Sequence, residues 1–187
     1  FDYLIVGAGS AGCVVANRLT DNKKFNVAIF EAGKSRDICK VIMPLALLYT
    51  MHDPRYNWKY FSEPDPHINN SRLFCPRGKM LGGCSAHNGM VFVRGNRDDY
   101  KRWESFGLKS WSYEKILPYF KKIENWSGGE NQYRGTLGLL PVNQSKNGNP
   151  LFKAFLNAAA EAGHKINSDM NGEDQEGFGM FDTTIHN

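Results

Sequence analysis

The chain has 187 residues, of which 41% are hydrophobic, 13% aromatic and 22% charged, as in an ordinary globular domain and unlike a disordered or collagenous chain. The formal net charge is +4, from 23 basic and 19 acidic residues spread along the chain. This spread argues against a nucleic-acid partner, and the lack of an apolar run of ~18 residues argues against a membrane span. Short basic clusters, such as Arg94 with Arg97, are interpreted as solvated surface.

The first 33 residues have the pattern of one βαβ unit. An apolar run from Asp2 to Val6 predicts a strand that ends at Gly7. Helical spacing then continues through Leu19, and residues 25–30 read as a second, buried strand.

A glycine-rich turn joins the first strand to the helix. It reads Gly7-Ala8-Gly9-Ser10-Ala11-Gly12. The three glycines permit, in order, a tight turn, a close approach of a pyrophosphate and close packing of the helix, whose N-terminus offers N–H groups. Glu31 follows Gly12 by 19 residues, near the spacing at which an acid hydrogen-bonds an adenosine ribose. A dinucleotide site is predicted, but FAD and nicotinamide cofactors share this geometry.

Residues 34–75 show no regular period and carry four prolines among aromatic residues. A loop of this length is usually functional, so we expect an excursion that covers the cofactor or contacts a partner subunit. Trp58, Tyr60 and Phe61 are interpreted as core or subunit-contact residues.

A second glycine-rich segment occupies residues 76–95. Its central part reads Arg77-Gly78-Lys79-Met80-Leu81-Gly82-Gly83-Cys84-Ser85-Ala86-His87-Asn88-Gly89-Met90-Val91. Paired glycines and small side chains would let the backbone lie against another part of a ligand.

Three helices are predicted in the second half of the chain. The first spans 98–106 and ends at Gly107, and the second follows Ser112 as N-cap, with Pro118 expected to distort it. The third spans 150–162. Loops around one strand are expected at 128–149, and a last strand without partners at 178–185.

The four cysteines show neither a CxxC pair nor metal-like spacing. They are Cys13, Cys39, Cys75 and Cys84. Reduced thiols are therefore expected, and neither disulfides nor a metal site is predicted.

Taken together, these motifs resemble the two N-terminal signatures of the glucose-methanol-choline (GMC) family of flavoproteins, close to its choline dehydrogenase and choline oxidase types. The resemblance rests on residues 2–33 and 76–95 and extends over essentially the whole chain. It implies an α/β fold with a Rossmann-like FAD-binding domain at 1–140. Residues 141–187 would begin a substrate-binding domain built on an antiparallel sheet. We therefore expect the chain to be a truncated, N-terminal part of a longer protein.

The resemblance also implies site residues, position by position. The first motif would hold the ADP half of FAD, and the second would lie along the diphosphate, ribityl chain and flavin edge. The residues assigned to FAD are Gly7, Gly9, Ser10, Ala11, Gly12, Glu31, Ala32, Arg77, Gly82, Gly83, Ser85, His87, Asn88, Gly89, Met90 and Val91. The family's substrate-facing histidine lies near the C-terminus of its members, so no catalytic residue is expected here.

His87 leaves two alternatives open. Choline oxidase-like members of the family carry a histidine here that bonds covalently to the flavin, whereas many members carry an aliphatic residue. A covalent bond would raise the flavin potential. The alternative is a histidine hydrogen-bonded near a non-covalent flavin.

The resemblance implies an FAD-dependent oxidoreductase that oxidises a choline-like or other primary alcohol to the aldehyde by hydride transfer to flavin. Oxygen or another electron acceptor would reoxidise it, and the fragment alone would be inactive. Two alternatives remain, a hydroxynitrile lyase of the same family and a non-catalytic flavin-binding module. A homo-oligomer is allowed, and the compartment is left open, with the cytoplasm preferred.

Overall fold

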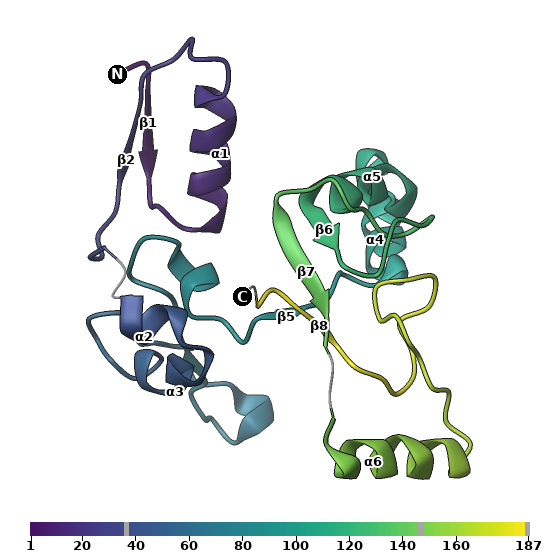
Figure 1. The fold of residues 1–187 in the computed structure, drawn as a ribbon. Coiled ribbons are helices and arrows are strands. Elements are labelled where there is room, and N and C mark those ends of the chain that lie inside the picture. The colour runs from purple at the N-terminus through teal and green to yellow at the C-terminus, as the bar shows by residue number, and fades with distance from the viewer. Residues whose placement is uncertain (36–37, 146–147, 186–187) are drawn as a thin grey trace. The chain divides into compact units, whose positions relative to one another are not determined.

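A computed structural model describes residues 1–35, 38–145 and 148–185 of the chain (Figure 1). The chain divides into two compact units, Phe1–Gly89 and Met90–Asn187. The functional boundary expected between residues 140 and 141 concerns the longer protein and stays a prediction.

The first unit begins with the predicted βαβ element. Strands β1 (Tyr3–Val6) and β2 (Val27–Phe30) pair in parallel, and helix α1 (Ser10–Thr20) lies alongside them (Figure 1). The mixed α/β class is thereby confirmed.

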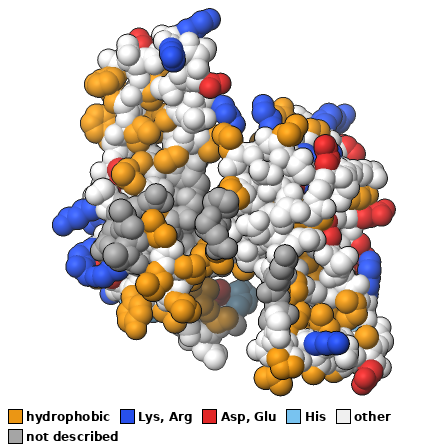
Figure 2. All heavy atoms as spheres, viewed as in Figure 1, with side chains coloured by type: hydrophobic (Ala, Val, Ile, Leu, Met, Phe, Trp, Pro, Cys, Tyr) orange, Lys and Arg blue, Asp and Glu red, His pale blue; other side chains and the backbone are white. Residues whose placement is uncertain are grey.

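The burial expected for the second strand is wrong. Phe30 is 57% exposed and Val6, at the end of β1, is 90% exposed. Figure 2 shows hydrophobic side chains on the surface over these strands. The physical reason is that each strand has a single hydrogen-bonded neighbour among the described residues, so this two-stranded sheet buries little of its apolar surface.

The segment 34–75 is more regular than expected. It contains the short helices α2 (Ile38–Ile42) and α3 (Leu47–Thr50), and strand β3 (Tyr60–Phe61) pairs antiparallel with β4 (Phe74–Cys75). Elements of two to five residues are too short to leave a periodic signature in the sequence. Cys13, Cys75 and Cys84 carry free thiols.

The second unit contains the three predicted helices, α4 (Arg97–Ser105), α5 (Tyr113–Ile123) and α6 (Pro150–Glu161). Ser112 stands at the N-cap of α5, but its side chain makes no capping hydrogen bond to a described residue. Helix α5 includes Pro118 within its bounds.

A four-stranded sheet gives the second unit its frame. The order is β5 (Val91–Phe92), β8 (Asp182–Thr183), β7 (Leu140–Gln144), β6 (Glu124–Trp126). The β5–β8 and β8–β7 pairings are antiparallel, and β6–β7 is parallel. The strand expected without partners at 178–185 is therefore shorter than predicted and has a partner on each side.

A buried ion network holds the second unit together at Arg134, whose side chain is fully buried. Its guanidinium donates to Glu124 at 3.1 Å, to Asp169 at 2.5 Å and to Asp182 at 2.7 Å. Arg94 donates to Glu124 at 2.6 Å. The interpretation of Arg94 as solvated surface is therefore wrong, because Glu124, 30 residues away in sequence, compensates its charge in the interior.

Asn171 connects this network to the backbone beside β5. Its side-chain oxygen accepts from the N–H of Arg94 at 2.8 Å, and its amide donates to the carbonyl of Phe92 at 3.0 Å. Gln175 donates to the carbonyl of Arg94 at 3.0 Å. Side chains from the 171–175 loop therefore fix residues 92–94, near the end of the second glycine-rich segment.

Among the described residues, no helix is long and apolar enough to cross a membrane, and no cluster of His, Cys, Asp or Glu could hold a metal ion.

Candidate dinucleotide-binding site

The turn between β1 and α1 has the conformation that the fingerprint predicts. Gly7 has φ +92°, a conformation that L side chains rarely adopt, and its N–H donates to the carbonyl of Phe30 at 2.7 Å. Helix α1 then begins at Ser10 with extended Gly9 as its N-cap. Because glycine has no capping side chain, the first-turn N–H groups remain available to an anion.

Gly12 lets the helix pack closely against this turn. A Cβ added at Gly12 would lie 2.1 Å from the carbonyl oxygen of Gly7, far inside van der Waals contact. By contrast, a Cβ at Gly9 would have the Gly83 Cα, at 4.0 Å, as its nearest described neighbour. Gly9 therefore leaves space open beside the turn. Gly12 lets helix α1 lie against the carbonyl of Gly7 without a clash.

Glu31 stabilises the turn from the end of β2. Its carboxylate accepts from the N–H of Ala8 at 2.8 Å and from the N–H of Gly33 at 2.8 Å. Each carboxylate oxygen has a further lone pair for a hydroxyl donor. The acid therefore shapes the phosphate-binding turn and is compatible with the predicted ribose contact, which stays a prediction.

The second glycine-rich motif lies directly against the first. The N–H of Gly82 donates to the carbonyl of Ala8 at 2.8 Å. A Cβ at Gly83 would stand 2.7 Å from the Cα of Gly9, so these backbones touch. Two motifs that are more than 70 residues apart in sequence thus meet in one place.

A groove of about 680 Å³ runs over this junction. Nine residues assigned to FAD from the sequence line it, namely Gly7, Gly9, Ser10, Ala11, Gly12, Glu31, Ala32, Arg77 and Gly83. Six further residues also line it, namely Val6, Phe30, Trp58, Tyr60, Gly78 and Cys84. A volume of this size is typical of a small-molecule or cofactor site.

Trp58 and Tyr60 were missed by the sequence reasoning. They are 41% and 52% exposed, so a core position for them is wrong. Their rings stack with an interplanar angle of 8°, but Lys59 between them has φ +54°, so the segment is not extended and strand periodicity could not have predicted their shared face.

The remaining assigned residues lie outside the groove lining. Gly82 and Ser85 are adjacent to it in the turn Gly83–Ala86, where Ser85 Oγ donates to the carbonyl of Gly82 at 2.6 Å. Asn88 and Gly89 are exposed at the end of the first unit. Met90 and Val91 belong to the second unit, where the N–H of Thr184 donates to the Met90 carbonyl at 2.9 Å.

His87 is the assigned residue with the most distinctive environment. It is 8% exposed, and its Nδ1 has no hydrogen-bond partner among the described residues. Desolvation by burial lowers the pKa of His87 below its ordinary value of 6.5. The imidazole is therefore neutral at neutral pH, with one ring nitrogen unpaired.

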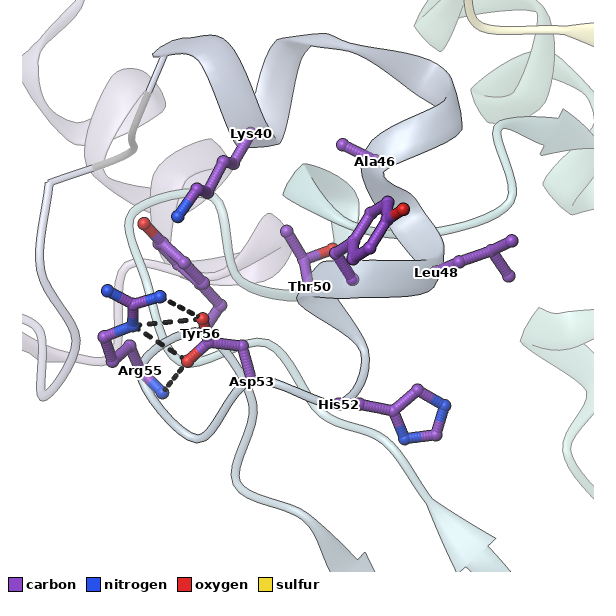
Figure 3. A pocket seen from close by; sticks show the side chains of 9 residues that line it. Lys40, Ala46, Leu48, Thr50, His52, Asp53, Arg55 and Tyr56 are labelled. Carbon is purple, nitrogen blue, oxygen red and sulfur yellow. Dashed lines mark hydrogen bonds and ion pairs between the residues drawn. The ribbon is translucent and has the colours of Figure 1, made fainter.

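The first unit contains a second hollow of about 640 Å³ beside α3 (Figure 3). Asp53 and Arg55 in its lining pair with each other at 2.5 Å, and this hydrogen bonding lowers the pKa of Asp53 to about 2. Neither glycine-rich motif lines this hollow, so the groove is the better candidate for the site.

The chain matches the family model described as GMC oxidoreductase over residues 1–187. It is 49% identical over 184 residues to an oxygen-dependent choline dehydrogenase of Sinorhizobium fredii, covering 98% of this chain and 33% of that protein. It is 47% identical to the protein of the same name from Brucella anthropi, covering 100% of this chain and 34% of that protein. The chain spans about a third of the length of the curated relatives that it matches.

Solved structures show the same fold. Pyridoxine 4-oxidase from Mesorbium loti superposes with a TM-score of 0.90 at 28% identity, over 99% of this chain and 36% of that one. A formate oxidase of Aspergillus oryzae, in a study of its FAD modification, superposes with a TM-score of 0.86 at 27% identity, over 100% of this chain and 34% of that one.

Proposed function

Because the chain belongs to the GMC oxidoreductase family, we propose that it forms the FAD-binding part of an enzyme that oxidises an alcohol to an aldehyde. The observation that carries this proposal is the groove, where the fingerprint turn, Glu31 and Gly83 meet. When bound, FAD supplies a hydride acceptor for the alcohol carbon.

The residues present fit this cofactor. The uncapped N-terminus of α1 suits the diphosphate, and the space above Gly9 admits it, because a Cβ there would meet nothing closer than 4.0 Å. Glu31 has lone pairs left for the ribose. Arg77, which also lines the groove, supplies positive charge toward the same anion.

The relatives support one substrate class for this proposal. Proteins named as choline dehydrogenases share nearly half of this chain's residues, which favours choline or another primary alcohol. Oxygen or another acceptor would take the electrons. Inactivity of the chain alone stays a prediction, as does its place in a homo-oligomer.

His87 would hold the flavin covalently. A neutral imidazole with an unpaired nitrogen is the state that a nucleophilic ring nitrogen requires, and burial produces that state here. Acid precipitation of the intact protein tests the linkage. Yellow colour in the pellet supports the bond, and H87A should move that colour to the supernatant. Colour in the supernatant of the unmodified protein rejects the bond.

The visible spectrum of the intact protein tests cofactor binding. We expect flavin absorbance that G9V abolishes, because valine would fill the space above the turn without a backbone clash. G148V is the matched control, since a Cβ at Gly148 also meets no described atom within 4 Å but lies outside the groove. A colourless unmodified protein, or a yellow G9V, contradicts the proposed site.

Anaerobic addition of choline or another primary alcohol tests the reaction. Bleaching of the flavin band supports oxidation. A flavin that stays oxidised while the protein cleaves a hydroxynitrile would indicate the lyase alternative. A flavin that responds to neither would indicate a binding module.

A further inference from the structure

Met90 has an unusual backbone conformation for a residue with a long side chain. Its φ is +57°, in the left-handed region that residues other than glycine, asparagine and aspartate rarely adopt. All the residues assigned to FAD lie in the described ranges, and no other non-glycine residue among them has a positive φ. Such a conformation persists only where neighbouring contacts hold it, and it occurs preferentially at functional sites.

Thr184 holds Met90 at its carbonyl. The N–H of Thr184 donates to the Met90 carbonyl at 2.9 Å, and Thr184 Oγ1 donates to the same oxygen at 3.4 Å. Directly after Met90, strand β5 pairs antiparallel with β8, with Val91 opposite Thr183. The carbonyl of Met90 and the strand that follows it are therefore both fixed by residues 182–184.

The other side of Met90 has open space. Asn88 and Gly89 are exposed, and a Cβ added at Gly89 would meet no described atom within 4 Å. Because the carbonyl side of Met90 is fixed, its φ sets the direction of the peptide group that joins it to Gly89. Residues 88–91 are all among those assigned to FAD. The strained torsion of Met90 therefore determines the conformation of this assigned segment, which has room beside it for a ligand.

We propose that Met90 and Thr184 are positioning residues for the flavin ring. Thr184 holds Met90 in its left-handed conformation, and that conformation presents the backbone of residues 88–91 to the flavin. This inference rests on the proposed function. The backbone torsion of Met90 carries the role, so a residue that tolerates a positive φ can replace the methionine.

Binding of FAD and of ADP to the flavin-free intact protein tests the inference. An H87A background keeps the flavin removable whether or not a covalent bond forms. In titration calorimetry, M90V should raise the Kd of FAD about tenfold, because a β-branched residue disfavours a positive φ. M90G should stay within about threefold, since glycine adopts this φ readily. Neither variant should change the Kd of ADP, which lacks the flavin.

Variants of Thr184 test whether it acts through Met90. T184V removes the hydroxyl donor and should raise the Kd of FAD about threefold, whereas T184S keeps the donor and should leave it unchanged. In the M90G protein, T184V should have no effect on the Kd of FAD, because glycine needs no support in this conformation. If T184V acts equally with and without M90G, the two residues are not coupled and the inference is wrong.

K23V is the matched control, because Lys23 also has a left-handed φ, of +56°, and does not line the groove. It should leave both Kd values unchanged. The inference is overturned if M90V binds FAD as tightly as the background protein, or if M90G loses as much affinity as M90V. Equal rises for FAD and ADP in M90V also overturn it. If the background protein binds neither ligand, the proposed function fails, and the flavin role of Met90 fails with it.

Hydrogen exchange of the flavin-free protein tests the contact without any cofactor. M90V should speed the exchange of the Thr184 amide about tenfold, and M90G should leave it protected, because this amide donates to the Met90 carbonyl. Equal exchange in the two variants would contradict the inference even if FAD binds. If M90V does not fold, the comparison of T184V with and without M90G decides the matter.

Discussion

The two units hold their irregular segments in opposite ways. Around the groove, segments are positioned by the absence of side chains, since Gly12 and Gly83 stand where a Cβ would enter neighbouring backbone. In the second unit, segments are positioned by long charged side chains, with Arg134 joining three carboxylates in a buried centre. The first arrangement leaves open volume for a ligand beside the glycines, whereas the second fills the space around Arg134 with paired side chains.

The buried titratable groups of the two units also differ in how their pKa values are shifted. Burial alone would lower the pKa of Arg134, but hydrogen bonds to Glu124 and Asp182 raise it above its ordinary value. In the first unit, burial lowers the pKa of His87. The second unit thus holds a buried charge that is paired at Arg134, and the first unit holds a buried neutral base at His87.

The largest effect is expected at the ion network. R134M should lower the free energy of unfolding by about 3–5 kcal/mol, because it leaves buried carboxylates without their partner. K165M is the matched control, since the Lys165–Asp174 pair is exposed, and it should cost less than about 1 kcal/mol. Urea denaturation measures both, and equal losses would mean that burial does not distinguish the two pairs.

A smaller effect is expected at the fingerprint turn. G12A should cost about 1–3 kcal/mol, because its Cβ must displace the Gly7 carbonyl, 2.1 Å away. G148A adds the same methyl group in open space and should change the stability little. Thermal unfolding of the two variants compares them, and a G12A protein as stable as G148A would refute the close packing.

The smallest effect is a pH dependence at His87. Its pKa is lowered in the folded state, so the unfolded chain takes up this proton first as the pH falls. The free energy of unfolding that His87 contributes is therefore fully present above pH 6.5. The free energy of unfolding should decline as the pH drops through and below that value. Urea titrations of the flavin-free protein between about pH 8 and 5 should show this slope, and H87Q should reduce it. An unchanged slope in H87Q would show that other groups cause it.

Local patterns predicted the groove better than they predicted the ion network. The turn at Gly7, helix α1 and the position of Glu31 follow from short-range spacing, because each depends on residues close in sequence. Arg94 and Arg134 gave no signal, since the burial of a charge depends on partners up to 48 residues away. The exposed Trp58 was misjudged because an aromatic side chain at a groove and one in a core look alike in sequence.

The contact between Gly78, Gly83 and Gly9 has a consequence for how this protein can vary. A Cβ at Gly78 would lie 2.3 Å from the carbonyl group of Gly83, and one at Gly83 would lie 2.7 Å from Gly9. Any coding change at Gly78 or Gly83 adds at least one carbon atom, and no single compensating change can make room in a neighbour that is already glycine. We therefore expect a saturation-mutagenesis library to lose nearly all substitutions at these two positions, and to keep many more at exposed positions of the groove lining such as Val6 and Phe30.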